Sequence, residues 1–144
     1  MTHVVTPAEG LARLRAAADS GSLDALCERY AIRVLTVFGS AGRAEPQARD
    51  LDIGVLFEHG GTPALLELMV ELDGVTGADN DVVHLNRAGP VLRERAFVGS
   101  VWLYESEPGA LADAMTAAIA ERIDTDPGRR LDLELMAGRG RSCQ

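Results

Sequence analysis

Residues 32–57, IRVLTVFGSAGRAEPQARDLDIGVLF, contain two apolar segments separated by a Gly-Ser turn and a polar stretch. Ile32 to Phe38 is almost wholly apolar and rich in β-branched residues, which predicts a strand buried on both faces. It stops at Gly39-Ser40, and residues 41–49 indicate one helical turn or a loop. From Asp50 to Phe57 apolar residues alternate with Asp and Gly, which predicts a second strand with its acidic side chains on one face.

Helices and two further strands are predicted around this pair of strands. Turn residues, capping residues and apolar spacing set the expected boundaries. Ser22 is expected to cap the second helix. The expected helices are Pro7–Ala18, a segment after Ser22 through Tyr30, Thr62–Leu72, Pro90–Val98, a helix opened by Ser106 and Pro108 that carries Leu111 to Ile119, and a separate short helix at Arg130–Met136; the further strands are Asp81–Leu85 and Val101–Tyr104.

These elements predict an α/β (α+β) fold, with a small mixed sheet of about four strands packed by helices on one face. A chain of 144 residues fits a single domain, and a composition of 47% hydrophobic residues is enough for one core. We expect the domain to span residues 1–137. The Arg-Gly-rich end, residues 138–144, is expected to be a disordered tail.

The charge and the cysteines exclude several classes of protein. A net charge of -8 argues against direct nucleic-acid binding, because phosphate contacts need clustered Lys and Arg. A nucleotide held through divalent cations remains compatible with that charge. Cys27 and Cys143 lie far apart and indicate neither a disulfide nor a zinc site. With no signal peptide and no apolar run long enough for a membrane span, a cytoplasmic protein is expected.

Two features of residues 39–52 suggest chemistry. Asp50 and Asp52 project from the same strand face about 7 Å apart at Cα, close enough to grip divalent ions, although Asp-x-Asp also arises on solvated strand ends. The Gly39-Ser40 turn directly after a buried strand lets backbone N–H groups approach a phosphate, and the serine hydroxyl adds a donor. The combination is much rarer by accident than either part, and it favours a metal-dependent phosphate site.

At this point the sequence resembles a known family. FGSAGR at residues 38–43, followed by DLDIGV at 50–55, is similar to the signature of the DNA polymerase β-like nucleotidyltransferases. The short chain and DVVHLNRA at residues 81–88, followed by Leu92-Arg93 and the Leu-Tyr-Glu sequence at 103–105, resemble the minimal nucleotidyltransferases (MNT) of that superfamily. The resemblance extends from Leu23 to the closing helix.

The resemblance implies a metal-dependent transfer of a nucleotide from ATP. In such enzymes two Mg²⁺ ions bridge the triphosphate and the attacking hydroxyl during an in-line displacement at the α-phosphorus. Asp81 would be the third carboxylate and would help to deprotonate the acceptor hydroxyl. By position, the metal and catalytic residues would be Asp50, Asp52 and Asp81, and the nucleotide-binding residues Gly39, Ser40 and Arg43.

Some residues admit a second interpretation or depart from the family pattern. Asp81 could be a solvated residue at a strand start, and Arg43 an ordinary surface arginine. Ala44 stands where the family usually has glycine, Arg49 stands where serine often precedes the first aspartate, and the spacing from Ser40 to the first aspartate is one residue shorter than in many members. His84 occupies a position where many minimal members have an acid, and we interpret it as a packing residue on a strand.

The resemblance also suggests a partner. Minimal nucleotidyltransferases commonly occur as antitoxins beside helical HEPN ribonuclease toxins, and some transfer AMP to a tyrosine hydroxyl of the toxin. Two alternatives remain: an inactive antitoxin whose acidic surface covers a basic ribonuclease, and an enzyme that modifies a small molecule such as an aminoglycoside. The short chain disfavours the small-molecule enzyme, unless a homodimer, which is compatible with the sequence, supplies the missing wall. No membrane partner is expected.

Overall fold

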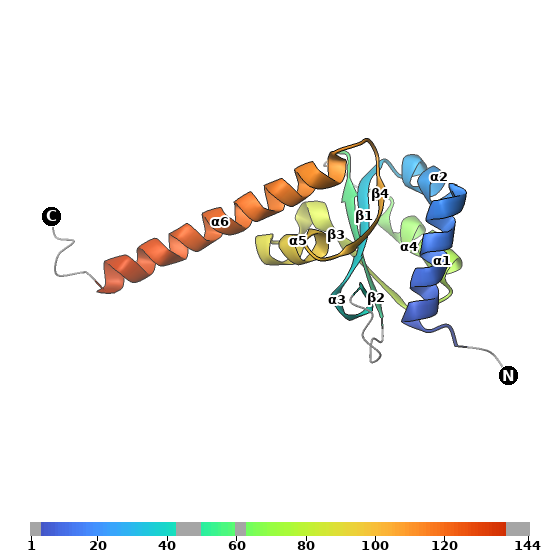
Figure 1. Ribbon diagram of the computed structural model, residues 1–144, viewed down its shortest axis with the longest axis horizontal. Helices are drawn as coiled ribbons and strands as arrows, with labels where there is room; N and C mark the ends of the chain where they lie inside the picture. Colours follow the sequence, from blue (N-terminus) through green and yellow to red (C-terminus); the bar gives the residue numbers. More distant parts are fainter. Residues whose placement is uncertain (1–3, 43–49, 60–62, 138–144) are drawn as a thin grey trace.

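The computed structural model describes residues 4–42, 50–59 and 63–137, with the backbone alone for residues 40, 41 and 125–137. Helices and strands alternate along the chain around one sheet (Figure 1). The elements are α1 (Pro7–Ser20), α2 (Ser22–Arg29), β1 (Ile32–Phe38), α3 (Gly39–Gly42), β2 (Leu51–Phe57), α4 (Leu65–Thr76), β3 (Asn80–His84), the 3₁₀ helix η1 (Leu85–Arg87), α5 (Pro90–Phe97), β4 (Val101–Glu105) and α6 (Ala110–Ala137).

The sheet has four strands in the order β3-β2-β1-β4. β1 pairs antiparallel with β2 and with β4, whereas β2 and β3 run parallel. The expected α/β fold with a small mixed sheet is therefore confirmed. The two strands of residues 32–57 are its central pair.

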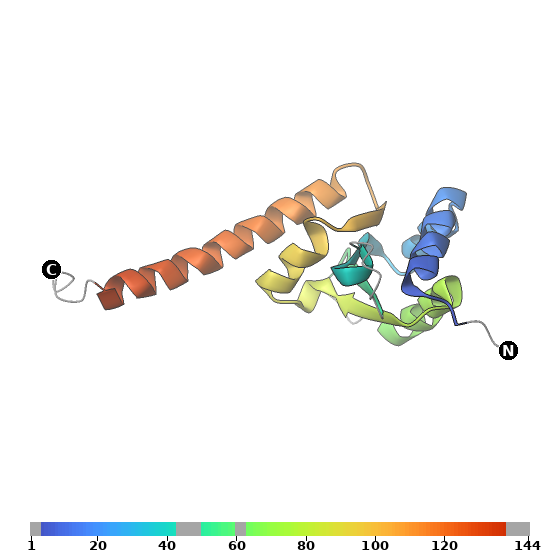
Figure 2. The ribbon, with the colours of Figure 1, turned by 60° about the horizontal axis from the view of Figure 1, so that its bottom comes forward.

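Helices cover both faces of the sheet, so the prediction that they pack on one face is wrong. α1, α2 and α4 lie on one side, and α5 and α6 lie on the other (Figures 1 and 2). Each side has its own cluster of buried side chains. The physical reason is in the central strands: Leu35 and Val37 face the first cluster, Val34 and Phe38 face the second, and a strand that is apolar on both faces needs cover on both.

α6 is one helix of 28 residues, and the prediction of a separate short helix at Arg130–Met136 is wrong. Pro127-Gly128 lies within α6, although proline removes a helical N–H and glycine disfavours helix. The residues that follow, RRLDLELMA, are mostly strong helix formers and continue the helix. α6 extends far beyond α5 (Figure 1). In the part of the chain that the structure describes, no helix is long and apolar enough to cross a membrane.

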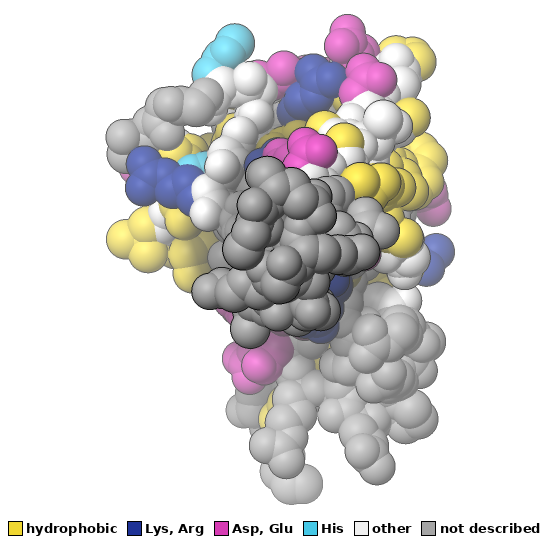
Figure 3. Space-filling model, turned by 90° about the vertical axis from the view of Figure 1, so that its left-hand side faces the viewer, with side chains coloured by type: hydrophobic (Ala, Val, Ile, Leu, Met, Phe, Trp, Pro, Cys, Tyr) yellow, Lys and Arg dark blue, Asp and Glu magenta, His cyan; other side chains and the backbone are white. Residues whose placement is uncertain are grey.

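The surface near α6 is partly hydrophobic. In the view along this helix, hydrophobic side chains gather on the right-hand flank (Figure 3). Ile119 and Ile123 of α6 are 40% and 54% exposed, respectively. By contrast, Ala110, Ala114 and Ala118 of the same helix are buried against the sheet. The first half of α6 thus packs through buried alanines, with Leu111 and Met115 partly buried beside them, and leaves Ile119 and Ile123 exposed.

The caps of α1 and α2 show one clear departure from the expectations; α4 (Leu65–Thr76) and α6 (from Ala110) also begin later than predicted. α1 begins with a complete capping box between Thr6 and Glu9. Ser22 is the first residue of α2 and not its cap; Gly21, in the left-handed region at φ 86°, serves both as the C-cap of α1 and as the N-cap of α2. A one-residue link leaves no room for a separate capping serine. Cys27 is buried in α2, and burial raises its pKa.

Candidate active site

The pairing of β2 with β3 brings two of the predicted carboxylates together. Asp52 and Asp81 are direct partners in the parallel register, which places neighbouring strands about 4.8 Å apart. Asp50 lies just before β2, two residues from Asp52 and exposed. Asp81 is exposed as well, whereas Asp52 is partly buried. The acidic residues therefore lie at the beginnings of two adjacent strands, and two of the three side chains are open to solvent.

A polar network fixes the start of β3 and with it the place of Asp81. The side-chain amide of Asn80 donates to Asp73 Oδ1 at 2.8 Å and to Thr76 Oγ1 at 2.9 Å. Thr76, the last residue of α4, is fully buried. On the other side, the N–H of Leu51 donates to the carbonyl of Asp79 at 3.0 Å. The turn before Asp81 is thus held to both α4 and β2.

The glycine turn after β1 meets the aspartate of β2. Gly39 has φ 71°, a conformation that side chains rarely adopt, and a Cβ placed on it would collide with Asp52 Oδ2. The chain then continues into α3, a single helical turn in contact with β1 and β2. The two halves of the sequence motif therefore lie against each other. The side chain of Ser40 and all of Arg43, like Ala44 and Arg49, fall outside the described residues, so their expected roles stay predictions.

The electrostatics of the site centre on Asp52. Burial raises the pKa of this carboxyl, and the negative charges of Asp81 and Asp50 raise it further. The positive charge of Arg95 acts in the opposite direction on the same pKa. The three predicted carboxylates thus influence one another, and a cation is already near them. Arg95 cannot be recognised from the sequence, because nothing in the local pattern of α5 shows which strand residue it approaches.

At the other end of β2 from the acidic residues, Asn86 follows β3 and contacts Phe57. Its side-chain amide accepts from the N–H of Phe57 at 2.8 Å and donates to the carbonyl of Phe57 at 3.1 Å, which extends the β2–β3 pairing beyond the end of β3. His84, the last residue of β3, stacks edge-on against the Phe57 ring with centroids 5.2 Å apart. Burial, followed by the charge of Arg87, lowers its pKa. His84 therefore packs on the strand, in agreement with the sequence interpretation.

We call the starts of β2 and β3, with Asp50, Asp52 and Asp81, the acidic corner of the sheet. Its carboxylates suit Mg²⁺, which prefers carboxylate oxygens. Two carboxylates stand side by side on strands with fixed register, and their mutual repulsion at Asp52 is the kind that a divalent cation relieves. Among the described residues, however, no three Asp, Glu, His or Cys side chains converge closely enough to form a ready metal site. The assignment of Asp50, Asp52 and Asp81 as metal ligands stays a prediction that the strand geometry supports.

A strand, a glycine turn and paired aspartates on adjacent parallel strands define the class of nucleotidyltransferases. The family described as polymerase beta, nucleotidyltransferase matches residues 22–108, which is more than half of the chain. The chain therefore belongs to the polymerase β nucleotidyltransferase family, and the resemblance found in the sequence is confirmed. Among curated proteins no match is found.

Solved structures with the same fold include a proposed minimal nucleotidyltransferase and chains of toxin–antitoxin complexes. The first is 33% identical, with a match that covers 70% of this chain and 98% of that chain at a TM-score of 0.52. A toxin–antitoxin complex with AMP-PNP gives 18% identity, 83% and 98% coverage and a TM-score of 0.64. A tri-AMPylated Shewanella oneidensis HEPN toxin in complex with MNT antitoxin gives 16% identity, with a match that covers 85% of this chain and 98% of that chain at a TM-score of 0.61. At such identities the two complexes show the fold alone.

Proposed function

We propose that this protein is a metal-dependent nucleotidyltransferase and the antitoxin of a HEPN/MNT pair, which transfers AMP from ATP to a tyrosine hydroxyl of its HEPN toxin. The observation that carries the proposal is the meeting of Gly39 with Asp52 and of Asp52 with Asp81 at one corner of the sheet. Residues 1–137 would form the catalytic domain, with residues 138–144 outside it.

Each group at this corner would have a separate task. The turn backbone at Gly39 and Ser40 would hold the phosphates, because a glycine lets N–H groups approach an anion closely. Asp52 and Asp50 would hold Mg²⁺ ions, which would neutralise negative charge on the phosphates and on the departing pyrophosphate. Asp81, exposed beside Asp52, would bind the remaining side of the cation site and take the proton of the acceptor hydroxyl.

The accessibility of the carboxylates supports a protein as acceptor. Asp50 and Asp81 are exposed, and no second domain walls them in within the described chain. A tyrosine on the surface of a folded toxin can approach such a corner, whereas a small molecule would have few walls to bind it. The complex of an MNT antitoxin with an AMPylated HEPN toxin shows that a protein of this fold occurs beside such an acceptor.

The deciding experiment measures transfer of labelled AMP from ATP with Mg²⁺ to a purified HEPN protein as the acceptor. The wild type is compared with an Asp50→Asn/Asp52→Asn double variant and with Asp19→Asn/Asp24→Asn, which removes two exposed carboxylates from α1 and α2. We expect transfer to fall by at least about 100-fold in the first variant and to persist in the second. Mass spectrometry of the toxin should place the AMP on tyrosine.

A second candidate is an inactive antitoxin that neutralises its toxin by binding. The net charge of -8 favours it, because an acidic surface complements a basic ribonuclease without any chemistry. Full neutralisation of the toxin by the Asp50→Asn/Asp52→Asn variant, together with no AMP transfer by the wild type, would establish this candidate in place of the enzyme.

A further inference from the structure

The side chain contacts of α5 place its last turn against the acidic corner. Thr36 Oγ1, buried in β1, donates to the carbonyl of Ala96 at 2.8 Å. Gly54 of β2 is the register partner of Thr36, and a Cβ placed on it would lie 3.4 Å from the Cβ of Ala96. The absence of a side chain at Gly54 therefore lets α5 approach the strands two residues along from Asp52, on the same face of β2.

Arg95 immediately precedes Ala96 and so lies next to this close approach. Its side chain is exposed, and its charge acts on Asp52 against the charges of the neighbouring aspartates. The other arginine of α5, Arg93, is bound to Glu121 of α6 at 3.0 Å. For Arg95 the described part of the chain shows no hydrogen bond or ion pair, so packing and stability do not account for it.

The corner also lacks other positive charge among the described side chains near Asp52. A nucleoside triphosphate brings several negative charges to three carboxylates, so its phosphates need cationic donors in addition to metal ions. A guanidinium offers two parallel N–H groups that match the oxygens of a phosphate, and it stays charged at any physiological pH. An exposed and unpaired arginine can turn toward such a ligand without breaking an existing bond.

We propose that Arg95 binds the phosphate groups of the nucleoside triphosphate in the active site. This inference rests on the proposed function and adds a residue on α5 to the turn after β1 as a source of phosphate contacts. It also gives a reason for the small residues on this face of the sheet. Gly54 and the Thr36 hydrogen bond determine how closely α5, which carries Arg95, approaches β1 and β2.

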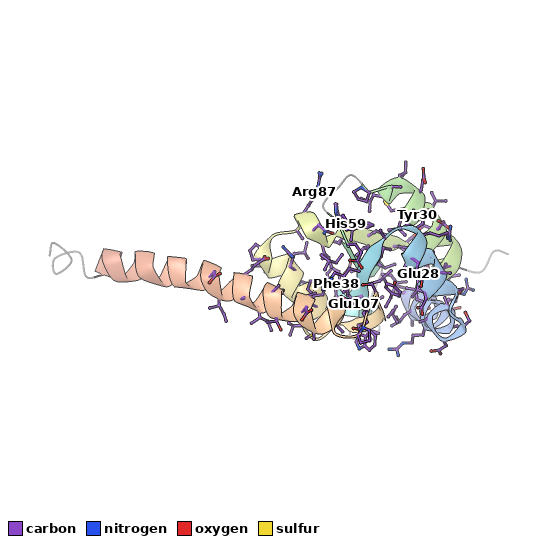
Figure 4. The ribbon with its side chains drawn as sticks, turned by 90° about the horizontal axis from the view of Figure 1, so that it is seen from above. Glu28, Tyr30, Phe38, His59, Arg87 and Glu107 are labelled. Carbon is purple, nitrogen blue, oxygen red and sulfur yellow. The ribbon has the colours of Figure 1, made fainter. Side chains whose placement is uncertain are left out.

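The test uses the full chain and NMR titrations with ATP and with adenosine at fixed Mg²⁺. The variants are Arg95→Ala, Arg95→Lys and, as a matched control, Arg87→Ala. Arg87 is an exposed arginine of η1 that points away from the body (Figure 4). We expect Arg95→Ala to weaken ATP binding roughly 10- to 100-fold, Arg95→Lys to weaken it less, and Arg87→Ala to leave it unchanged. Adenosine, which has no phosphate, should bind all variants alike.

The outcomes separate this inference from the proposed function. Equal ATP affinity in the wild type and Arg95→Ala overturns the inference and leaves the proposed function standing. Equal loss of ATP and adenosine binding in Arg95→Ala also overturns it, because it indicates a structural role. If the wild type binds no ATP, the proposed function and the inference both fail. Matching thermal melting curves for Arg95→Lys and the wild type exclude misfolding as the cause of a change.

Discussion

The two faces of the sheet are built from different residues. On the face covered by α1, α2 and α4 the buried cluster consists mainly of large side chains, among them Leu14, Leu35 and Leu68, all with no exposed area. On the face covered by α5 and α6, four of the nine buried residues of the cluster are alanines, and Gly54 brings the helix still closer. The carboxyl group of Asp52 and the guanidinium of Arg95 belong to this second face.

This difference suggests separate roles: the first face mainly stabilises the fold, and the second mainly positions functional side chains. Large leucines bury much apolar area, so the first face supplies most of the hydrophobic free energy of folding. Small residues bury little area, but they allow a helix backbone to approach a strand closely, and the helix then carries a charged side chain to a defined place. Substitutions on the first face should therefore change stability above all, and substitutions on the second should change ligand binding as well.

The largest expected effect is on the leucine face. Leu68→Ala in α4 removes a fully buried side chain and leaves a cavity, so the free energy of unfolding should fall by about 3 kcal/mol, measured by urea denaturation. Leu66→Ala, two residues away and 74% exposed, is the control and should change it by less than about 0.5 kcal/mol. ATP affinity per folded molecule should be unchanged in both. A clear loss of affinity in folded Leu68→Ala would contradict the division between the faces.

The second effect tests the close approach of α5. In Gly54→Ala the new methyl group would lie 2.9 Å from both Leu85 Cδ1 and Thr36 Oγ1, so overpacking should cost about 2 kcal/mol. The displaced helix should also move Arg95 and weaken ATP binding. Gly74→Ala is the control: it lies within α4, a Cβ there meets nothing within 4 Å, and the change should stabilise the protein by about 0.5–1 kcal/mol. Unchanged stability of Gly54→Ala would show that this face is loosely packed.

A smaller effect is expected from the hydrogen bond that ties α5 to β1. Thr36→Val keeps the shape of the buried side chain but removes the hydroxyl that donates to the carbonyl of Ala96, which should cost about 1 kcal/mol in chemical denaturation. Thr116→Val removes a comparable bond to the carbonyl of Ala112 on the exposed side of α6, and it should cost less than about 0.5 kcal/mol. Equal costs for the two variants would show that the buried bond has no special role.

The sequence predicts the elements of this fold better than their arrangement. Runs of apolar residues and their alternation locate β1 and β2, because these patterns follow from the geometry of a strand itself. They do not give the pairing of Asp52 with Asp81, which depends on the register between strands distant in the chain; that placement came from the family resemblance. The prediction that helices pack on one face failed because it did not use the two-sided burial that the sequence of β1 already indicated.

In the candidate site, too, the sequence identifies residues of a local motif but not residues that tertiary contacts bring together. Gly39, Asp50 and Asp52 are local in sequence, and the motif identifies them directly. Arg95 carries no local signal, since an arginine on a helix is an ordinary surface residue until the tertiary structure places it. Its position depends on how α5 packs over Gly54, and only the structure shows this.

The smallest expected effect is an increase in stability, opposite in sign to the effects above, and it depends on pH. The folded protein raises the pKa of Asp52 above the value of 3.8 for an unperturbed aspartate, through burial first and then through the charges of Asp81 and Asp50. A raised pKa of an acid contributes stability that is fully present below the unfolded pKa and is lost as the pH rises through the folded pKa. At neutral pH the ionised Asp52 therefore destabilises the fold, and Asp52→Asn should relieve that cost.

Without Mg²⁺, Asp52→Asn should raise Tm at pH 7.5 by about 1–2 °C, since solvent screens this partly exposed carboxylate and limits the gain to about 0.5 kcal/mol. The gain should shrink as the pH approaches 4, where the wild-type carboxyl takes up its proton. Asp19→Asn, which removes an exposed carboxylate of α1, is the control for the change of net charge alone. Because a bound ion stabilises only the folded protein, Mg²⁺ should raise Tm in the wild type and not in Asp52→Asn. A lower Tm for Asp52→Asn at pH 7.5 would mean that Asp52 holds the fold together, and the second face would then serve stability as the first does.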